Sequence, residues 1–415
     1  MRTYPRYIAT ASPHVRPEDL ATCVSCGLCL NDCPTYRVMH DEADSPRGRV
    51  QLIRELVATP GRAEASTVAH LEACLVCRAC ETACPSLVPF GRIMEGAREE
   101  LAARRRPSPV RAALVDVVTH PRLLVAVAWV VRVYERSGLA RVARRVLPRR
   151  LAELERLLPR PEGAPFAPRR RGGADTDTQL LAGCVMRAAF GDTQRATVRL
   201  LERAGRTVDA PAGQTCCGAL HAHAGLGDRA RDLARRNVRA FGDGNAPIVS
   251  TAAGCGAHLR AYGWLLADDP EYAARAARLA SRVRDASEIV RIPDGPALPR
   301  RLRVVYQDAC HLAHGQGIRR QPRDLLRAID GVEVVSIADP DRCCGSAGIY
   351  NLTHPEVAAE LGRQKVAAIL GADPDVVVSA NPGCILQIRS GLEAAGKRVP
   401  VVHLMRFLDD PSAVI

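Results

Sequence analysis

The sequence predicts an α+β protein of several domains, in which a helical, cysteine-rich segment and a helical connector precede two duplicated α/β modules. Three observations support this prediction. Two cysteine runs of identical spacing lie within residues 1–100, residues 101–175 contain no cysteine, and the same cysteine landmarks recur in residues 176–298 and 299–415. These four ranges are the expected domains. A chain of 415 residues, of which 47% are hydrophobic, is long enough for two to four compact domains.

The charge and the first residues bear on the partners and the location of the protein. The net charge of +13 comes almost wholly from arginine, since Lys365 and Lys397 are the only lysines. This bias alone is weak support for a nucleic-acid partner. The opening residues lack the apolar segment of a secretory signal, and the longest apolar run, Leu123–Val131, is far shorter than the roughly 20 residues of a membrane-spanning helix. We expect a cytoplasmic protein that does not bind nucleic acid.

Sixteen cysteines in a cytoplasmic chain indicate metal binding rather than disulfides, because that compartment keeps thiols reduced. Eight of them form two runs with the spacing Cys-x2-Cys-x2-Cys-x3-Cys-Pro. The runs are Cys23, Cys26, Cys29 and Cys33 before Pro34, and Cys74, Cys77, Cys80 and Cys84 before Pro85. This spacing is typical of ferredoxin-type [4Fe–4S] ligands, whereas zinc sites use two separated pairs. The runs predict a helical two-cluster ferredoxin domain, with a zinc knuckle or buried reduced cysteines as the alternative.

The spacing also predicts which cysteines share a cluster. Three thiolates two residues apart cover one face of a cubane, and the fourth cysteine of each run serves the other cluster. The first cluster is expected on Cys23, Cys26, Cys29 and Cys84, and the second on Cys74, Cys77, Cys80 and Cys33. Two clusters held in this way lie close together, which suits electron transfer.

The two C-terminal ranges are an internal repeat. Their landmarks are Cys184, the pair Cys216 and Cys217, and Cys255 in the first module, and Cys310, the pair Cys343 and Cys344, and Cys384 in the second. Equivalent cysteines are offset by 126 to 129 residues, which indicates one duplicated fold. Short β-branched runs end in cysteines at 179–184, 247–255, 303–310 and 375–384, and segments of helical length such as 193–204 and 355–370 lie between them. This alternation predicts mostly parallel sheets with the cysteines at the carboxyl ends of the strands.

The same eight cysteines are the expected metal ligands of the modules. Adjacent cysteines before a glycine, as at 216–218 and 343–345, can present both sulfurs to a multinuclear site, which a cysteine from a strand end completes. An ordinary cubane, a zinc ion, and a cluster completed by a nearby group such as Asp308 all fit this pattern. The histidines near these cysteines are His221, His223, His258 and His311. Each is either a further ligand or an ordinary loop residue.

The connector is expected to be helical, because residues 98–171 combine many arginines with apolar residues such as Leu123 and Trp129. A basic amphipathic helix with a tryptophan can lie on an anionic membrane, which would bring the protein to the inner face of the cell membrane and its quinone pool. A helix that packs over the ferredoxin domain is the alternative. No glycine-rich nucleotide fingerprint follows a predicted strand, so a flavin or nicotinamide is expected on another chain.

Over nearly its whole length the sequence resembles the iron–sulfur subunit of bacterial glycolate oxidase, and more broadly proteins with the cysteine-rich CCG domain. Besides the cysteine patterns, Asp-Ser-Pro-Arg-Gly-Arg at 44–49 and Cys-Pro-Thr-Tyr at 33–36 match that family. One departure is clear. Relatives with the full CCG pattern end in Cys-x2-Cys, whereas Ala252 and Asn381 occupy the penultimate position here, so each module keeps four cysteines and a five-thiolate noncubane cluster is in doubt.

The resemblance implies an oxidoreductase subunit with no catalytic residue of its own. It implies that a FAD-containing partner oxidises a small 2-hydroxy acid, glycolate to glyoxylate or also D-lactate. This chain would then pass the electrons singly through [4Fe–4S] clusters toward the quinone pool or another acceptor. The alternatives are a subunit of a lactate or glycerol-3-phosphate dehydrogenase, a module that reduces a disulfide as in heterodisulfide reductase, and zinc-stabilised modules that serve only for docking.

Overall fold

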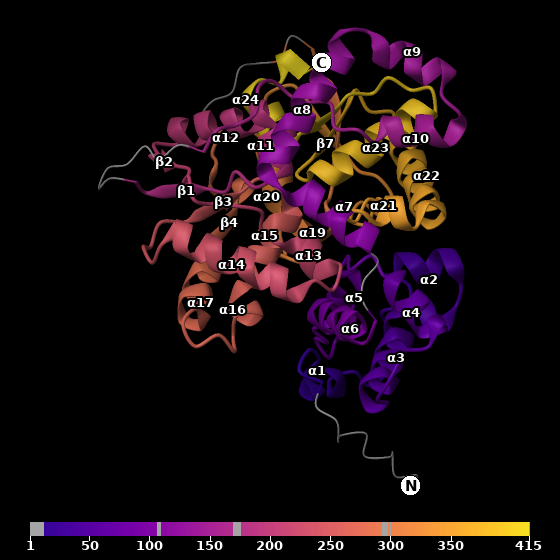
Figure 1. Ribbon diagram of the computed structural model, residues 1–415. Helices are drawn as coiled ribbons and strands as arrows, with labels where there is room; N and C mark the ends of the chain where they lie inside the picture. The colour runs from indigo at the N-terminus through magenta and orange to yellow at the C-terminus, as the bar shows by residue number, and fades with distance from the viewer. Residues whose placement is uncertain (1–11, 106–108, 169–175, 293–297, 299, 415) are drawn as a thin grey trace.

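The computed structural model describes residues 12–105, 109–168, 176–292, 298 and 300–414. The N-terminal helices, drawn in indigo, form one end of the molecule, and two α/β modules lie above them (Figure 1). The helices of the connector run along the modules. The predicted order of a helical segment, a helical connector and two α/β modules is confirmed.

The N-terminal segment is helical throughout its regular elements. These are α1 (Pro17–Ala21), α2 (Pro34–Met39), η1 (Glu42–Asp44), α3 (Pro46–Ala58), α4 (Ala65–Glu72), α5 (Ala79–Thr82) and α6 (Phe90–Arg104). Pro34 and Pro46 occupy the first positions of α2 and α3, where a missing N–H costs nothing. The Ser45 hydroxyl accepts a hydrogen bond from an amide in the first turn of α3 and caps that helix. Apolar side chains such as Ile53 and Met94 form the core of the segment.

The connector is a chain of four helices. They are α7 (Pro109–Thr119), α8 (Pro121–Arg136), α9 (Leu139–Val146) and α10 (Arg149–Arg156). Pro121 begins α8, and the His120 imidazole accepts a hydrogen bond from the Leu123 amide at 3.3 Å. Among the described residues, no single helix is both long and apolar enough to cross a membrane. Only α7 from Ala112 together with α8, a pair bent by 78°, reaches that length and composition.

The first module is built around a four-stranded parallel sheet with the order β2-β1-β3-β4. Its strands are β1 (Thr178–Leu180), β2 (Val208–Asp209), β3 (Ile248–Ser250) and β4 (Val283–Asp285). Its helices are α11 (Val185–Ala189), α12 (Gly191–Arg203), α13 (Ala219–His223), α14 (Gly227–Phe241), α15 (Ala253–Arg260), α16 (Tyr262–Leu265), α17 (Ala273–Arg282) and α18 (Ala286–Ile289). Gln179 of β1 lies opposite Ile248 of β3, so the strands that precede the first and last cysteines are neighbours.

The second module repeats this topology with the order β6-β5-β7-β8, again parallel throughout. Its strands are β5 (Leu302–Gln307), β6 (Val332–Val335), β7 (Val376–Ser379) and β8 (Val401–His403). Its helices are α19 (Cys310–Ala313), α20 (Arg320–Arg327), α21 (Tyr350–Thr353), α22 (Pro355–Gly371), α23 (Pro382–Ala394), α24 (Leu404–Asp409) and η2 (Ser412–Val414). The duplication predicted from the cysteine offsets therefore extends to strand order and direction.

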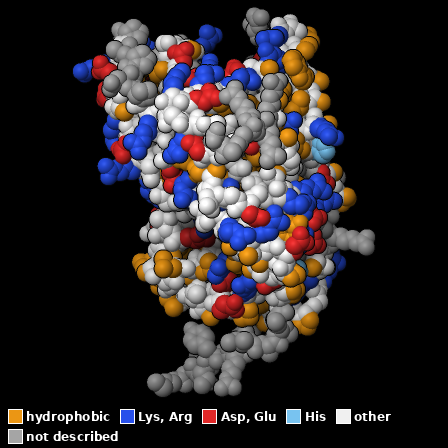
Figure 2. All heavy atoms as spheres, turned by 90° about the vertical axis from the view of Figure 1, so that its left-hand side faces the viewer, with side chains coloured by type: hydrophobic (Ala, Val, Ile, Leu, Met, Phe, Trp, Pro, Cys, Tyr) orange, Lys and Arg blue, Asp and Glu red, His pale blue; other side chains and the backbone are white. Residues whose placement is uncertain are grey.

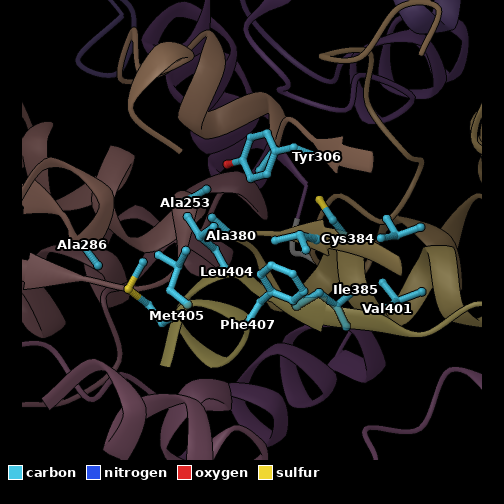
Figure 3. Close-up of a cluster of buried hydrophobic side chains, with 14 of the residues drawn as sticks. Ala253, Ala286, Tyr306, Ala380, Cys384, Ile385, Val401, Leu404, Met405 and Phe407 are labelled. Carbon is cyan, nitrogen blue, oxygen red and sulfur yellow. The ribbon is translucent and has the colours of Figure 1, made fainter. Parts of the chain in front are cut away.

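One hydrophobic core joins the two modules. Figure 3 shows Ala253 and Ala286 of the first module beside Ala380 and Met405 of the second. The Ala253 amide donates a hydrogen bond to the Ala380 carbonyl at 3.1 Å, directly beyond the ends of β3 and β7. The two sheets thus meet at the ends of the strands that lead to the last cysteine of each module.

Arginine and acidic side chains are interleaved on the surface. Arg235 lies 2.7 Å from Asp269, and Arg275 lies 3.0 Å from Asp243. On the face shown in Figure 2, blue and red side chains are mixed and the positive charge does not gather in one patch. The arginines on that face are therefore interspersed with acidic side chains.

Candidate iron–sulfur centres

The structure brings the sulfurs of the N-terminal segment together in two pockets. The first pocket is lined by Cys23, Cys26, Cys29 and Cys84, with Cys80 at its inner wall. The second is lined by Cys33, Cys74, Cys77 and Cys80. The fourth cysteine of each run therefore lies in the pocket of the other run. Cys80 lines both pockets, and each pocket contains at least the four cysteines that a [4Fe–4S] cluster requires.

The two loops that wrap these pockets have the same backbone conformation. Ser25 and Gly27 have positive φ angles of 57° and 86°, and the equivalent Val76 and Arg78 have φ angles of 51° and 65°. A β-branched residue such as Val76 rarely adopts this left-handed conformation, and strain of this kind is concentrated at functional sites. Left-handed residues turn successive amides inward and make a concave nest for an anion, as at Fe–S sites. The loop geometry thus fits a negatively charged cluster.

The pockets differ in exposure. Cys26 is exposed, whereas Cys33, Cys74, Cys77 and Cys80 are all buried. Burial raises the pKa of the Cys80 thiol well above its usual value. A cluster binds thiolates, so these buried sulfurs need the positive charge of iron to stay deprotonated.

A buried ion pair lies beneath the second pocket. Arg49 Nη2 donates to Asp44 Oδ1 at 2.9 Å, and both side chains are at most 1% exposed. Arg49 Nη1 also donates to the Thr35 hydroxyl at 2.9 Å, and that hydroxyl lies 3.3 Å from Cys33 Sγ. The Asp-Ser-Pro-Arg-Gly-Arg segment therefore holds Cys33, the cysteine that crosses to the second pocket. Buried networks of this kind are strongly orienting when every member is paired.

The four cysteines of the first module meet in one group, in which Cys184, Cys216 and Cys217 are buried and Cys255 is partly exposed. Cys217 Sγ lies 3.3 Å from Cys255 Sγ. The hydrogen bond with Cys216, together with burial, raises the pKa of Cys184 well above its usual value. The amide of Gly218 donates to Cys216 Sγ at 3.5 Å, a contact that stabilises a sulfur ligand and tunes a cluster.

The second module gathers its four cysteines in the same way. Hydrogen bonds with Cys310 and Cys344, together with burial, raise the pKa of Cys343 well above its usual value. Asn381, which stands where a fifth cysteine is found in the full CCG pattern, donates from Nδ2 to Cys384 Sγ at 3.4 Å. Asn381 therefore provides a hydrogen bond to a cysteine sulfur, where the full CCG pattern has a fifth sulfur ligand. Lys365 is buried beside the group, and its Nζ donates to the Asp339 carbonyl at 2.7 Å.

The first and the last cysteine of each module lie at the beginnings of helices that follow the strands. Cys184 is the N-cap of α11 and Cys310 is the first residue of α19, while Cys255 and Cys384 are the third residues of α15 and α23. We expected them at strand ends, and the structure places them in the helical turn that follows. The N-termini of α15 and α23 favour negative charge, which stabilises a thiolate.

Of the other candidate ligands from the sequence, His311 lies near a module cysteine, with Nδ1 3.7 Å from Cys310 Sγ, whereas Asp308, His221 and His223 pair with other groups. Both carboxylate oxygens of Asp308 accept hydrogen bonds from Arg323, at 2.7 and 2.6 Å. His221 lies 3.3 Å from Asp116, and His223 lies 2.9 Å from Glu95. The remaining two histidines, with His223, line a separate cavity that contains no cysteine.

The second N-terminal pocket adjoins the cysteines of the second module. Cys77, Cys310, Cys343 and Tyr350 belong to one buried cluster. The Tyr350 hydroxyl donates to the Ala73 carbonyl at 3.0 Å, just before the second cysteine run. Burial raises the pKa of Cys77, and the neighbouring Cys310 raises it further. Two groups of sulfurs from segments far apart in sequence thus lie side by side.

Sequence reasoning missed the residues that fix this arrangement. Arg98 donates to the carbonyl oxygens of Cys74 and His223, and it joins the N-terminal segment to the first module. Tyr350 does the same for the second module. Arg98 has no sequence signal that separates it from the many other arginines, and Tyr350 lies in no recognised motif.

Comparison with known proteins agrees with this geometry. The family described as "4Fe-4S dicluster domain" matches residues 19–88, which contain all eight cysteines of the two runs. This match confirms the predicted pair of [4Fe–4S] clusters. The family described as "Cysteine-rich domain" (CCG) matches residues 178–260 and 304–389, which correspond to the two modules.

The connector and the full-length relatives identify the family. Residues 107–158 match the family described as "Glycolate oxidase iron-sulfur subunit, linker region". The chain is 35% identical to the probable glycolate oxidase iron-sulfur subunit of Bacillus subtilis and 34% identical to the glycolate oxidase iron-sulfur subunit of Escherichia coli, in each case over 94% of this chain and 93% of the relative. It is also 30% identical to a fumarate reductase (CoM/CoB) subunit of Methanothermobacter marburgensis, over 99% of this chain and 77% of that protein. This chain therefore belongs to the family of glycolate oxidase iron–sulfur subunits.

Proposed function

We propose that this subunit receives electrons from a FAD-containing partner that oxidises glycolate to glyoxylate, and passes them singly toward the quinone pool. The observation that carries the proposal is the series of adjoining sulfur sites, from the exposed first pocket to the buried second pocket and on to Cys310. A flavin delivers two electrons from a 2-hydroxy acid, whereas clusters accept one at a time, so a relay is required. The protein supplies the ligands, the burial and the hydrogen bonds to sulfur that set cluster potentials.

The proposed ligands follow from the two pockets. Cys23, Cys26, Cys29 and Cys84 hold the first [4Fe–4S] cluster, and Cys33, Cys74, Cys77 and Cys80 hold the second. The buried cysteine groups of the modules hold further metal centres. The module ligands are Cys184, Cys216, Cys217, Cys255, Cys310, Cys343, Cys344 and Cys384.

The flavoprotein is proposed to dock over the first pocket. Val24 and Leu28 line its mouth and are 69% and 61% exposed, and Leu87, three residues beyond Cys84, is 79% exposed. Large apolar side chains exposed together mark an interaction surface. Docking here would bring the flavin to the most accessible cluster, with Cys26 at the contact.

Anaerobic purification of the tagged chain tests the function directly. We expect FAD to copurify, and we expect glycolate to bleach the visible cluster absorbance and to produce the EPR signals of reduced clusters. A double variant, Leu28→Asp with Leu87→Asp, should keep its iron but lose the copurified FAD. The control, Leu151→Asp on α10, changes an equally apolar residue that is 51% exposed and should retain FAD. Cluster reduction by D-lactate but not by glycolate would reassign the substrate.

A cytoplasmic location, with the connector in peripheral contact with the inner face of the cell membrane, is also proposed. On α8, Trp129, Val130 and Val133 are 49%, 69% and 64% exposed, and on α9 Val142 and Val146 are also exposed. Apolar residues beside arginines are typical of a helix that lies on an anionic surface. The protein should float with vesicles that contain anionic lipid at low salt, and Val130→Asp should reduce the bound fraction. Equal flotation of the variant would contradict this contact.

A further inference from the structure

A cavity of about 220 Å³ lies where the N-terminal segment meets both modules. Its walls are formed by α5 and α6 of the N-terminal segment, by α13, α15 and α16 of the first module, and by α19 of the second. Three imidazoles line it, those of His223, His258 and His311. The cavity is distinct from the two cysteine pockets, because no cysteine contributes to its wall.

The imidazoles are not arranged for a single metal ion. The rings of His223 and His311 are stacked at 25° with centroids 5.4 Å apart, and the His258 ring lies 6.5 Å from that of His223. Within the described part of the chain, donor atoms of three potential metal ligands lie within 4.8 Å of one another at Asp41, Asp44 and His70, and not among the three imidazoles of this cavity. The cavity is therefore suited to a molecule.

Three buried nitrogen atoms of residues in the cavity wall have no hydrogen-bond partner among the described residues. They are His258 Nε2, His311 Nε2 and Trp264 Nε1. His258 is only 5% exposed. A buried polar group without a partner costs on the order of 1–3 kcal/mol, and native proteins leave few of them. An occupant with acceptor oxygens would satisfy the Trp264 indole N–H and the His311 imidazole N–H.

The charges of the wall are balanced. Arg78 lies 2.7 Å from Glu81, and Arg92 pairs with Asp19. Glu95 lies 2.9 Å from an imidazole nitrogen. Burial lowers the pKa of His258 to about 4, so this imidazole is neutral. A site for an anion would present excess positive charge, whereas this wall suits a neutral occupant.

Three residues of the cavity wall lie next to three groups of cysteines. Arg78 lines both this cavity and the second cysteine pocket. His311 Nδ1 lies 3.7 Å from Cys310 Sγ in the second module. His258 Nε2 packs against Gly218, where a Cβ would come within 3.5 Å of it, in the Cys-Cys-Gly turn of the first module. Only one residue of the wall would therefore separate an occupant of the cavity from each of the three groups of cysteines.

We propose that this cavity binds the ring of a neutral electron acceptor with two carbonyl groups, a quinone, and that the ring is reduced there. This inference rests on the proposed electron relay and names the site at which the electrons leave this chain. A cavity of about 150 Å³ accommodates benzene, so the ring fits. The carbonyl oxygens accept hydrogen bonds from the indole and imidazole N–H groups. Two electrons arrive singly from the sulfur sites, two protons come from solvent, and both C=O groups become C–OH.

Equilibrium dialysis of the anaerobically purified, cluster-loaded chain against menadione measures binding without turnover. The chain has two tryptophans, so Trp264→Leu in the cavity has a matched control, Trp129→Leu on α8. We expect Trp264→Leu to weaken binding about tenfold, as for one lost hydrogen bond, and Trp129→Leu to bind like the wild type. His223→Gln, a milder change in the same wall, should also weaken binding. Iron content and EPR spectra establish that each variant is folded.

The outcomes separate this inference from the proposed function. Equal menadione binding by the wild type, Trp264→Leu and His223→Gln would overturn it. Displacement of menadione by glycolate or glyoxylate would also overturn it, since that result would identify a carboxylate site. Reoxidation of dithionite-reduced clusters by menadione should be slowed in Trp264→Leu and unchanged in Trp129→Leu. Failure of glycolate to reduce the clusters, with menadione binding intact, would reject the proposed substrate and leave the cavity assignment standing.

Discussion

Replacement of Arg98 by methionine tests the joint between the N-terminal segment and the first module. Arg98 is 7% exposed. Its Nη2 donates to the carbonyl oxygens of Leu71 and Glu72, both at 3.0 Å, and to that of Cys74 at 2.5 Å. Its Nη1 donates to the carbonyl oxygen of His223 at 2.7 Å, across the joint. One side chain thus holds the loop that begins the second cysteine run against α13.

Methionine has a similar length but donates no hydrogen bond, so the substitution leaves several buried carbonyl groups without their donor. A hydrogen bond to a charged group contributes about 1.5–3 kcal/mol, and losses within one network are not additive. We expect the free energy of unfolding of the N-terminal segment to fall by about 3–5 kcal/mol, in the range of a disrupted buried network.

Anaerobic urea titration measures this loss, with the EPR signals of the two [4Fe–4S] clusters of the N-terminal segment as the probe, since these signals are resolved from those of any centre in the modules. The control is Arg37→Met on α2, where Arg37 Nη1 lies 3.9 Å from Asp339 and both side chains are about half exposed. Such an exposed pair is worth about 0.2–1 kcal/mol. An Arg98→Met protein within about 1 kcal/mol of Arg37→Met would refute the reasoning.

Three further predictions concern the sulfur sites. Cys84→Ala should alter the EPR signal of the solvent-accessible first cluster, and Cys33→Ala should alter the signal of the buried second cluster. The reverse result would contradict the assignment of the fourth cysteine of each run to the other cluster. Asn381→Ala should retain the metal of the second module but lower its reduction potential, because a hydrogen bond to sulfur at 3.4 Å is lost; an unchanged potential in a redox titration would count against this role. Burial raises the pKa of the Cys29 thiol to about 11. Since iron binds the thiolate, whose fraction rises about tenfold per pH unit below that pKa, iron uptake by the apoprotein should be faster at about pH 8 than at about pH 7, and equal rates would speak against it.

Strand prediction succeeded at the centre of each sheet and failed at its edges. The β-branched runs at 179–184, 247–255, 303–310 and 375–384 overlap β1, β3, β5 and β7, which are the central strands. Central parallel strands are buried on both faces and consist mainly of apolar residues. The edge strands were not predicted; β2 has only two residues, and β6 is only partly buried and so lacks a continuous apolar signal. Helices at 193–204 and 355–370 were also recognised, as α12 and α22.

The spacing of the cysteines along the chain was enough to establish the cluster type, the repeat and the family. The reason is that ligation by one cysteine run depends mainly on residues that are close together in sequence. Two cysteines separated by two residues can reach one iron site in almost any fold that contains the loop. Which sites adjoin was visible only once the chain was folded. Cys77 lies beside Cys310, and imidazoles from α13, α15 and α19 line one cavity, although long stretches of chain separate them. Contacts of this kind depend on how whole segments pack, through residues such as Arg98 and Tyr350 that carry no periodic or motif signal.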